Sequence, residues 1–517
     1  MTPSSTFALR HGLPGLAGTG LIAIGALGVG WLPPSSGMID APVVAILHTS
    51  LAGSMAARAL VIIGLAILLQ AWLVIGYELL SRSRAHVVTS TMDIAKVLAL
   101  WCAPLLLAPP LFSRDAYSYY VQGRVFSQGH DPTTTGVSVV PGWFDDGADP
   151  MWVESPTPYG PLFLAIERNV AEFAHPNAYL GGLIFRLAAV VGVVLIAWFL
   201  PRLARLHGID PARALWLGVL NPVVLMHFVA GAHNDALMVG LVVTGLALAA
   251  ERSCVWGAVA VSLGAAVKPI ALLALPFTGL LWAGRDGSWL DRIRAWLSTA
   301  LVAACTLASV FLVVGAGAGV LSAAFGTPSG VLTWLSPTTA IGRPIGLLLT
   351  WAGLTADAST ALSVVRLLGL AVALLAVAYL ALRPGGRSPV RGAALAFGVV
   401  VLLGPVVQPW YLLWFLPLFA ATGLSVRELR LAVFLTGVFT VHGMIESTIN
   451  ADNLTDISDT ITFAVAIGIV LVLLLASPRE RMLALGPPGV GGLMPQDEDA
   501  SSRADAMRWR ADARMRS

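Results

Sequence analysis

The segment FSRDAYSYYVQGR, residues 112–124, is the first candidate for chemistry, because an acid stands among tyrosines directly after an apolar run. If the segment is helical, Asp115, Tyr119 and Gln122 share one face. A carboxylate placed there could accept a proton from a hydroxyl group at the membrane surface. The structural alternative is that Ser113 caps the helix and Asp115 complements its dipole. Taken alone, the structural alternative is favoured.

A second candidate is the segment GAHND at 231–235, which lies between two apolar runs and offers His233, Asn234 and Asp235. Asp235 could serve only as a helix cap, and His233 could be a satisfied interfacial imidazole. A metal site would need more ligands than one histidine and one aspartate, and the sequence nominates none. We therefore predict no metal ligand and no required cofactor, and leave a divalent cation open.

Two cations are candidates for binding phosphate. Lys268 precedes Pro269 between two short apolar runs, and Arg343 lies in the stretch 316–358. A cation flanked by apolar sequence often pairs with an anionic group. For Lys268, snorkelling of the side chain to the membrane interface is an equal alternative.

Aromatic residues accompany these charges. Gln408, Trp410 and Tyr411 lie in the segment QPWY, and Tyr159 lies among prolines and acids. Such residues could line a groove for a lipid chain or a sugar. The commoner role of Trp410 and Tyr411 would be an aromatic belt at the interface, and Tyr159 could belong to a small loop core.

The elements that position these residues must be embedded in lipid. Hydrophobic residues make up 57% of the 517 positions and charged residues only 11%, whereas a soluble protein carries roughly 25% charged residues. The three cysteines lie in apolar segments without any metal or disulfide spacing.

We predict an all-α polytopic membrane protein with about fourteen (thirteen to fifteen) spanning helices, since only helices or closed barrels satisfy the backbone in hydrocarbon. The apolar runs lie near 13–32, 59–80, 94–112, 180–200, 212–230, 235–251, 254–267, 269–283, 295–315, 360–382, 390–407, 409–424, 428–447 and 460–476.

The basic residues predict the orientation. Most of the 31 Lys and Arg residues fall on one side if both termini are cytoplasmic. This assignment makes 113–179 a large extracytoplasmic loop after the third span. It also keeps 316–358 outside, with a re-entrant helix near 344–354 as an option. The domains expected are a transmembrane unit, 1–476, and a cytoplasmic tail, 477–517, whose composition is typical of disorder.

Several motifs resemble the GT-C superfamily of membrane glycosyltransferases, and more narrowly the actinobacterial polyprenol-phosphate-mannose-dependent α-1,6-mannosyltransferases of lipomannan and lipoarabinomannan biosynthesis. The matching motifs are FSRDAYSY (112–119), PYGP (158–161), LNPVVL (220–225), GAHNDALMVGL (231–241), AVKP (266–269) and PWY (409–411).

The resemblance implies a plasma-membrane enzyme that works outside the cell with a polyprenyl-phosphate mannose donor and a lipid-anchored mannan acceptor. Its partners would be these substrates and membrane lipids, with no nucleic acid. The reaction would be inverting, with Asp115 as the general base. The residues expected to bind the donor phosphate are Lys268, Arg343 and His233. Those expected to bind acceptor or donor are Tyr117, Tyr119, Gln122, Asn234, Asp235, Tyr159, Gln408, Trp410 and Tyr411.

Two other function classes share part of this pattern. A secondary transporter or flippase would place charges within repeated, broken helices, and no repeat is visible in the sequence. A ligase that moves a whole glycan would also need an external loop and basic phosphate ligands, so the sequence separates it poorly.

Overall fold

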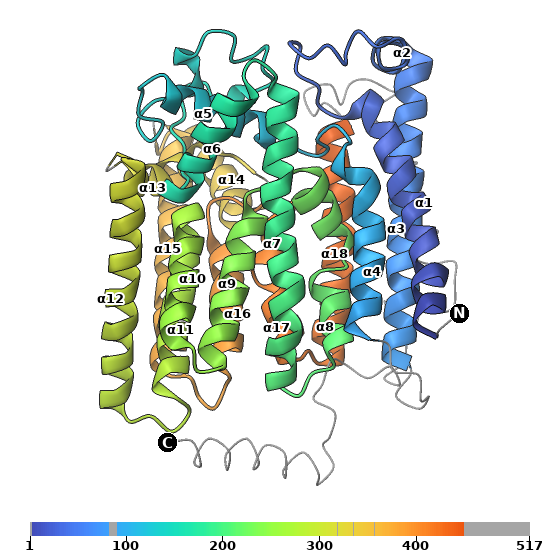
Figure 1. The fold of residues 1–517 in the computed structure, drawn as a ribbon. Coiled ribbons are helices and arrows are strands. Elements are labelled where there is room, and N and C mark those ends of the chain that lie inside the picture. The colour runs from blue at the N-terminus through green and yellow to red at the C-terminus, as the bar shows by residue number, and fades with distance from the viewer. Residues whose placement is uncertain (1–2, 82–89, 318, 334, 356, 449–517) are drawn as a thin grey trace.

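The computed structural model describes residues 3–81, 90–317, 319–333, 335–355 and 357–448. The regular elements of these residues are all helices (Figure 1). By length and composition five of the helices could cross a membrane: Phe7–Val29, Leu51–Leu80, Ala178–Leu206, Trp289–Val314 and Ala358–Leu382. A sixth is obtained if the bent pair Val224–Ala230 and Asp235–Ala250 forms one span.

The amino-terminal fifth contains a group of helices that pack through small residues. It contains α1 (Pro3–Val29), α2 (Pro42–Thr49), α3 (Leu51–Ser81), α4 (Thr91–Cys102) and the 3₁₀ helix η2 (Ala103–Leu106). A Cβ added at Gly64 of α3 would lie 2.5 Å from the carbonyl oxygen of Gly18 in α1. The absence of a side chain there lets the two backbones approach closely.

A layer of short helices covers one end of the long helices (Figure 1). It consists of α5 (Asp115–Ser127), the 3₁₀ turns η3 (Val137–Val139) and η4 (Pro150–Trp152), and α6 (Pro161–Ala174). α5 packs on α6 through Gly123, where an added Cβ would lie 2.0 Å from the carbonyl oxygen of Glu167.

The central part of the chain is interrupted repeatedly. It runs through α7 (Ala178–Leu206), α8 (Pro211–Gly218), the π-helix η5 (Val224–Ala230), α9 (Asp235–Ala250), α10 (Cys254–Val267), the 3₁₀ helix η6 (Pro269–Ala274) and α11 (Leu275–Ala283). η5 and α9 meet at an angle of 112°.

Proline explains two of the breaks. Lys268 and Gln408 each precede a proline, and both are extended, with ψ angles of 118° and 152°. A proline disfavours helical geometry in the residue before it and removes a backbone donor from the helix. The chain therefore leaves the helical path at two of the predicted site segments.

The last part contains α12 (Trp289–Val314), α13 (Val320–Gly330), α14 (Pro337–Trp351), α15 (Ala358–Leu382), α16 (Pro389–Leu403), the 3₁₀ helix η7 (Pro409–Trp414), α17 (Leu416–Thr422) and α18 (Val426–Thr448). The start of α14 is hydrogen-bonded to the segment that precedes η7. Thr338 and Thr339 donate hydrogen bonds to the carbonyl oxygens of Gly404 (2.9 Å) and Pro405 (2.9 Å).

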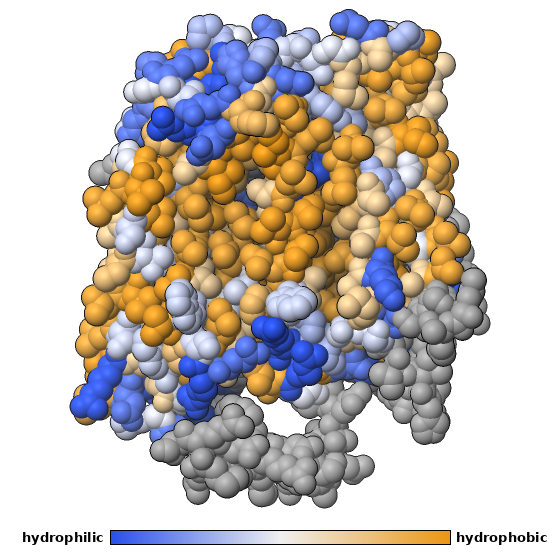
Figure 2. All heavy atoms as spheres, in the orientation of Figure 1, coloured by the Kyte–Doolittle hydropathy of each residue, from blue (hydrophilic) through white to orange (hydrophobic). Residues whose placement is uncertain are grey.

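The surface agrees with an integral membrane protein. Figure 2 shows an apolar band across the middle of the visible face, with polar residues gathered at both ends. Each predicted apolar run up to 428–447 overlaps a helical segment, but several of these segments are short or broken. The count of about fourteen spans stays a prediction, and the run 460–476 and the tail 477–517 lie outside the described residues.

Candidate active site

Asp115 is the first residue of α5, as the helical reading of its segment predicts. Its backbone N–H donates to Ser113 Oγ at 3.0 Å, but the N-cap residue of α5 is Arg114 and not Ser113. The carboxylate remains 16% exposed. Phe112, three residues earlier, has a φ of +66°, a conformation that is costly for a large side chain.

His233 lies against Asp115. Its Nδ1 is 3.2 Å from Oδ2 of Asp115, although the ring itself is fully buried. The imidazole stacks on the indole of Trp410 with 3.8 Å between ring centroids. Ala232, just before it, has a φ of +56°. Both loops that supply this contact therefore contain a strained non-glycine residue, a feature that is common at active sites.

Asp235 and Lys268 form a buried ion pair. Both carboxylate oxygens of Asp235 lie 2.9 Å from Lys268 Nζ, and Trp414 Nε1 donates to Oδ1 at 2.7 Å. Asp235 is 1% exposed and the lysine side chain 15%. Asn234 rather than Asp235 is the N-cap residue of α9, so the carboxylate of Asp235 is engaged by side chains and not by a helix end.

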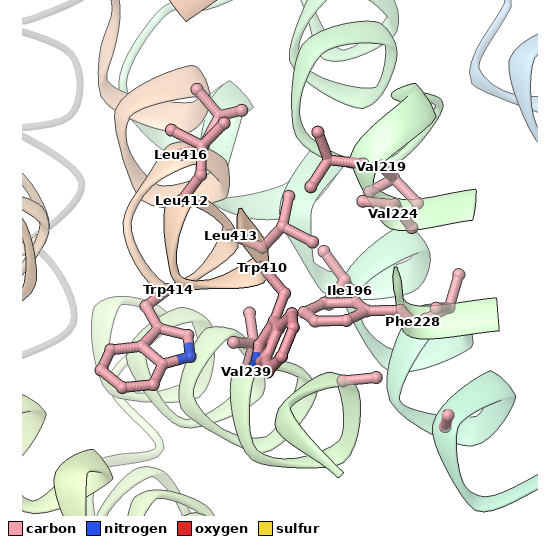
Figure 3. Close-up of a cluster of buried hydrophobic side chains, with 14 of the residues drawn as sticks. Ile196, Val219, Val224, Phe228, Val239, Trp410, Leu412, Leu413, Trp414 and Leu416 are labelled. Carbon is pink, nitrogen blue, oxygen red and sulfur yellow. The ribbon is translucent and has the colours of Figure 1, made fainter. Parts of the chain in front are cut away.

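Aromatic rings surround the ammonium group of Lys268. Its Nζ lies 5.7 Å from the ring centroid of Tyr159, 5.4 Å from that of Tyr411 and 5.5 Å from that of Trp414. Such distances allow cation–π attraction. In Figure 3 the indoles of Trp410 and Trp414 leave η7 on the same side, while Leu412 and Leu416 point to the other.

Two tyrosines connect the acid–imidazole contact with the ion pair. Burial raises the pKa of the Tyr119 and Tyr159 hydroxyls well above the usual value, and the negative charges of Asp115 and Asp235 both add to this effect. The rings of Tyr119 and Tyr159 meet edge to face with centroids 5.3 Å apart. Asp115, Asp235 and the two hydroxyls therefore belong to one site.

Buried polar atoms without a hydrogen bond from the described residues concentrate around this site. Native proteins leave few such atoms, so a cluster of them suggests groups that are satisfied by a bound molecule or by water. The atoms concerned are Tyr119 Oη, Gln122 Nε2, both ring nitrogens of His227, Nε2 of His233, both amide atoms of Asn234, and Trp410 Nε1.

The other predicted site residues make different kinds of contact, some of them structural. Tyr117 is a structural residue in this state, since its hydroxyl donates to the carbonyl oxygen of Trp31 at 2.8 Å. Gln122 is buried and accepts a hydrogen bond from Thr157 Oγ1 at 3.3 Å. Gln408 is the N-cap residue of η7. Arg343 lies within α14, and the ion pairs of Asp115, Asp235 and Lys268 among the described residues do not include it.

Three residues near the site are absent from the sequence-based prediction. Trp414 binds Asp235, and His227 lies between His233 and Phe112, with ring centroids 6.0 and 5.8 Å away. Burial raises the pKa of Asp149, and the charge of Asp115 adds to the effect. Among the described residues no group of three or more His, Cys, Asp or Glu side chains could hold a metal ion.

Comparison with known proteins gives consistent matches along the chain. Residues 12–284 match the family model "Alpha-(1->6)-mannopyranosyltransferase, N-terminal domain", and residues 338–448 match "MptB C-terminal domain". A Mycolicibacterium smegmatis protein named probable alpha-(1->6)-mannopyranosyltransferase is 33% identical over 95% of this chain and 92% of its own length.

Two further relatives carry related names. Alpha-(1->6)-mannopyranosyltransferase A of Mycobacterium tuberculosis is 34% identical over 80% of this chain and 79% of its own. Alpha-(1->6)-mannopyranosyltransferase B of Corynebacterium glutamicum is 30% identical over 78% of this chain and 71% of its own.

Proposed function

The chain belongs to the alpha-(1->6)-mannopyranosyltransferase family, and from this premise we propose that it transfers mannose from polyprenyl-phosphate mannose to an α-1,6-mannan on a lipid-anchored glycan. It is a mannosyltransferase, and its relatives' names imply a mannose donor and a glycan acceptor. The observation that carries the finer proposal is the contact of a partly exposed carboxylate, Asp115, with buried His233, beside the pair Asp235–Lys268.

Asp115 acts as the general base. It takes the proton of the acceptor hydroxyl while the acceptor oxygen forms a bond to the anomeric carbon of mannose. The bond between that carbon and the phosphate oxygen breaks at the same time, and polyprenyl phosphate leaves with the electron pair. A single displacement of this kind inverts the anomeric configuration, so a β-linked donor gives an α-linked product. General-base catalysis typically contributes about 10²- to 10⁴-fold.

Lys268 stabilises the departing phosphate. An ammonium group has three N–H donors, and two of them are directed to the two oxygens of Asp235. The third donor is left for a phosphate oxygen, and the side chain is 15% exposed. Asp235 offsets part of the positive charge, so Lys268 contributes mainly a directed hydrogen bond. Arg343 completes the phosphate site when the donor is bound.

The site faces outward in this proposal. The basic residues of the sequence favour cytoplasmic termini, and α5 and α6 then cover the extracytoplasmic end of the helices (Figure 1). A lipid-linked donor in the outer leaflet would bring its sugar phosphate to this level. A transporter of the same donor would need a path across the membrane and would make no glycosidic bond.

The deciding experiment uses the full-length protein in proteoliposomes, with radiolabelled polyprenyl-phosphate mannose and a short α-1,6-mannooligosaccharide acceptor. We expect Asp115→Asn to lower mannosyl transfer by about 10³-fold without loss of folded protein. The control is Asp131→Asn in the same loop layer, whose carboxylate bonds only to Thr133 among the described residues. Full transfer by Asp115→Asn would remove Asp115 as the base, and no transfer by the unaltered protein would refute the substrate pair.

A further inference from the structure

Arg186 is a fully buried arginine inside α7, one of the helices long and apolar enough to cross a membrane. Its guanidinium forms no ion pair with an acid among the described residues. Instead it donates to three backbone carbonyl oxygens: Nε to Val229 at 2.9 Å, Nη1 to Leu106 at 2.8 Å and Nη2 to Ala230 at 3.0 Å. An arginine in such surroundings is costly and is usually retained for a specific task.

The three carbonyls lie at the ends of two broken helical segments. Leu106 is the last residue of η2, and Val229 and Ala230 are the last residues of η5. The last carbonyls of a helix have no partner within it, and in hydrocarbon each unpaired group costs several kcal/mol. The planar guanidinium, with donors in several fixed directions, can satisfy both ends at once.

Each of these ends leads directly into a loop of the site. The chain leaves η2 at Leu106 and reaches Asp115 at the start of α5, whereas His233 follows Ala230 after two residues. The two loops are distant in sequence, and they meet where Asp115 Oδ2 and His233 Nδ1 approach to 3.2 Å. Arg186 therefore donates hydrogen bonds to the backbone at the point where each of the two loops begins.

We propose that Arg186 is a positioning residue that sets the distance between Asp115 and His233, an inference that rests on the proposed role of Asp115 as base. Tyr179, from the first turn of the same helix, adds a second connection by donating to the carbonyl oxygen of Leu107 at 2.6 Å. α7 thus supports both loops, and Arg186 is hydrogen-bonded to the ends of both helical segments.

The substitutions Arg186→Lys and Arg186→Gln test this role. Lysine keeps the charge but cannot reproduce the spread of the guanidinium donors. We expect Arg186→Gln to lower kcat by about 10²-fold, because a displacement of about 1 Å can have that effect. The KM for polyprenyl-phosphate mannose should change by less than about 2-fold, since Lys268 and Trp414 hold the donor side of the site independently. Arg186→Lys should lie between Arg186→Gln and the unaltered protein.

Arg213→Gln is the matched control. Arg213 also donates to a backbone carbonyl, from Nε to Leu79 at 3.0 Å, but that contact joins the start of α8 to the end of α3, away from the site. We expect this variant to retain normal kcat. All rates are divided by the amount of folded protein.

A double-mutant cycle with His233→Ala separates positioning from a general structural role. If Arg186 acts by placing His233 against Asp115, Arg186→Gln with His233→Ala should be no slower than the slower single variant. Multiplied losses, or a normal kcat in Arg186→Gln, would overturn the inference. If Arg186→Gln does not accumulate as folded protein, the cycle is repeated with Arg186→Lys, and the kcat of the double variant is again compared with that of the slower single variant. Absence of transfer in the unaltered protein would instead refute the proposed function.

Discussion

Lys268 holds Asp235 symmetrically, with its Nζ 2.9 Å from each carboxylate oxygen. Only the lysine of this pair is appreciably accessible, at 15% against 1% for the aspartate. Asp235 is the first residue of α9, and Lys268 directly follows Val267, the last residue of α10. The pair thus joins two helix ends and leaves one N–H of the lysine for a ligand.

This geometry predicts different effects on stability and on donor use. Lys268→Ala leaves a buried carboxylate without its cation and should destabilise the protein by about 3–5 kcal/mol. Adding Asp235→Asn removes the charge and keeps an acceptor for Trp414 Nε1, so most of the stability should return. The KM for the donor should stay high in both variants, because both lack the ammonium.

The measurements are the thermal unfolding midpoint in detergent and the donor KM in proteoliposomes. Asp235→Asn alone keeps the ammonium and serves as the comparison, and its donor KM should be lower than that of either variant without Lys268. A double variant that regains both stability and a normal donor KM would show that Lys268 has only a structural role.

The two indoles of η7 should respond differently to replacement by phenylalanine. Trp414 Nε1 donates to Asp235 at 2.7 Å, whereas Trp410 Nε1 has no hydrogen bond from the described residues. Trp414→Phe should lower stability by about 1.5–3 kcal/mol, as for loss of a hydrogen bond to a charged group. Trp410→Phe removes no such hydrogen bond, so it should cost less stability than Trp414→Phe, and it should lower transfer because the ring that stacks on His233 becomes smaller. Trp414→Phe should therefore have the lower unfolding midpoint of the two variants, and Trp410→Phe the lower transfer rate.

The strained backbone at Ala232 predicts an unusual tolerance of glycine. In an ordinary helical position, such as Ala260 in α10, Ala→Gly should cost about 1–2 kcal/mol through lost helix propensity and a lost buried methyl group. At Ala232, with a φ of +56°, relief of about 1–2 kcal/mol of left-handed strain offsets this cost. Ala232→Gly should thus be nearly neutral in unfolding experiments, and a loss equal to that of Ala260→Gly would contradict the prediction.

The buried carboxyl group of Glu167 should make the stability of the protein depend on pH. Burial raises the pKa of its carboxyl well above the usual value, and neither oxygen has a hydrogen bond from the described residues. The folded state therefore binds this proton more tightly than the unfolded state, and stability falls as pH rises above the unfolded pKa. Glu167→Gln removes this dependence, so its gain in unfolding midpoint should be small at pH 5 and larger at pH 8.

Glu172→Gln on the same helix is the control for Glu167. Glu172 forms an exposed ion pair with Arg168 at 2.9 Å, with both side chains 48% exposed. Such pairs contribute about 0–1 kcal/mol, and the midpoint should change little between the two pH values. If the change in unfolding midpoint depended on pH equally in the two variants, Glu167 would not be the source of the pH-dependent stability.

The helices and their interruptions follow largely from local sequence. Apolar runs predict where the helices lie, and Pro269 and Pro409 explain why the chain is extended at Lys268 and Gln408. The helical reading of 112–124 places Asp115 on α5. Span length is harder to predict, because hydropathy does not distinguish a continuous helix from two short ones with a bend of 112° between them.

The partners within the site depend on contacts that local patterns do not encode. Trp414 and Asp235 are separated by 179 positions, and an indole in an apolar run looks like any other core residue. His227 and Asp149 come close to His233 and Asp115 only in the folded protein, so the local sequence does not indicate that they lie near the site. The sequence leaves Lys268 open between snorkelling and anion binding, and in the structure its ammonium group is paired with Asp235. Arg343 remains a prediction, since donor binding is what would test it.

The hydrogen bond from Trp414 to Asp235 also has a consequence for biosynthesis. This hydrogen bond is one of the contacts that join the two separately matched regions, 12–284 and 338–448. A chain emerging from the ribosome contains Asp235 and Lys268 long before it contains Trp414. A product truncated within 285–409 would carry Asp115, His233, Asp235 and Lys268 and still lack both indoles, so completion of the enzyme is tied to insertion of its last helices.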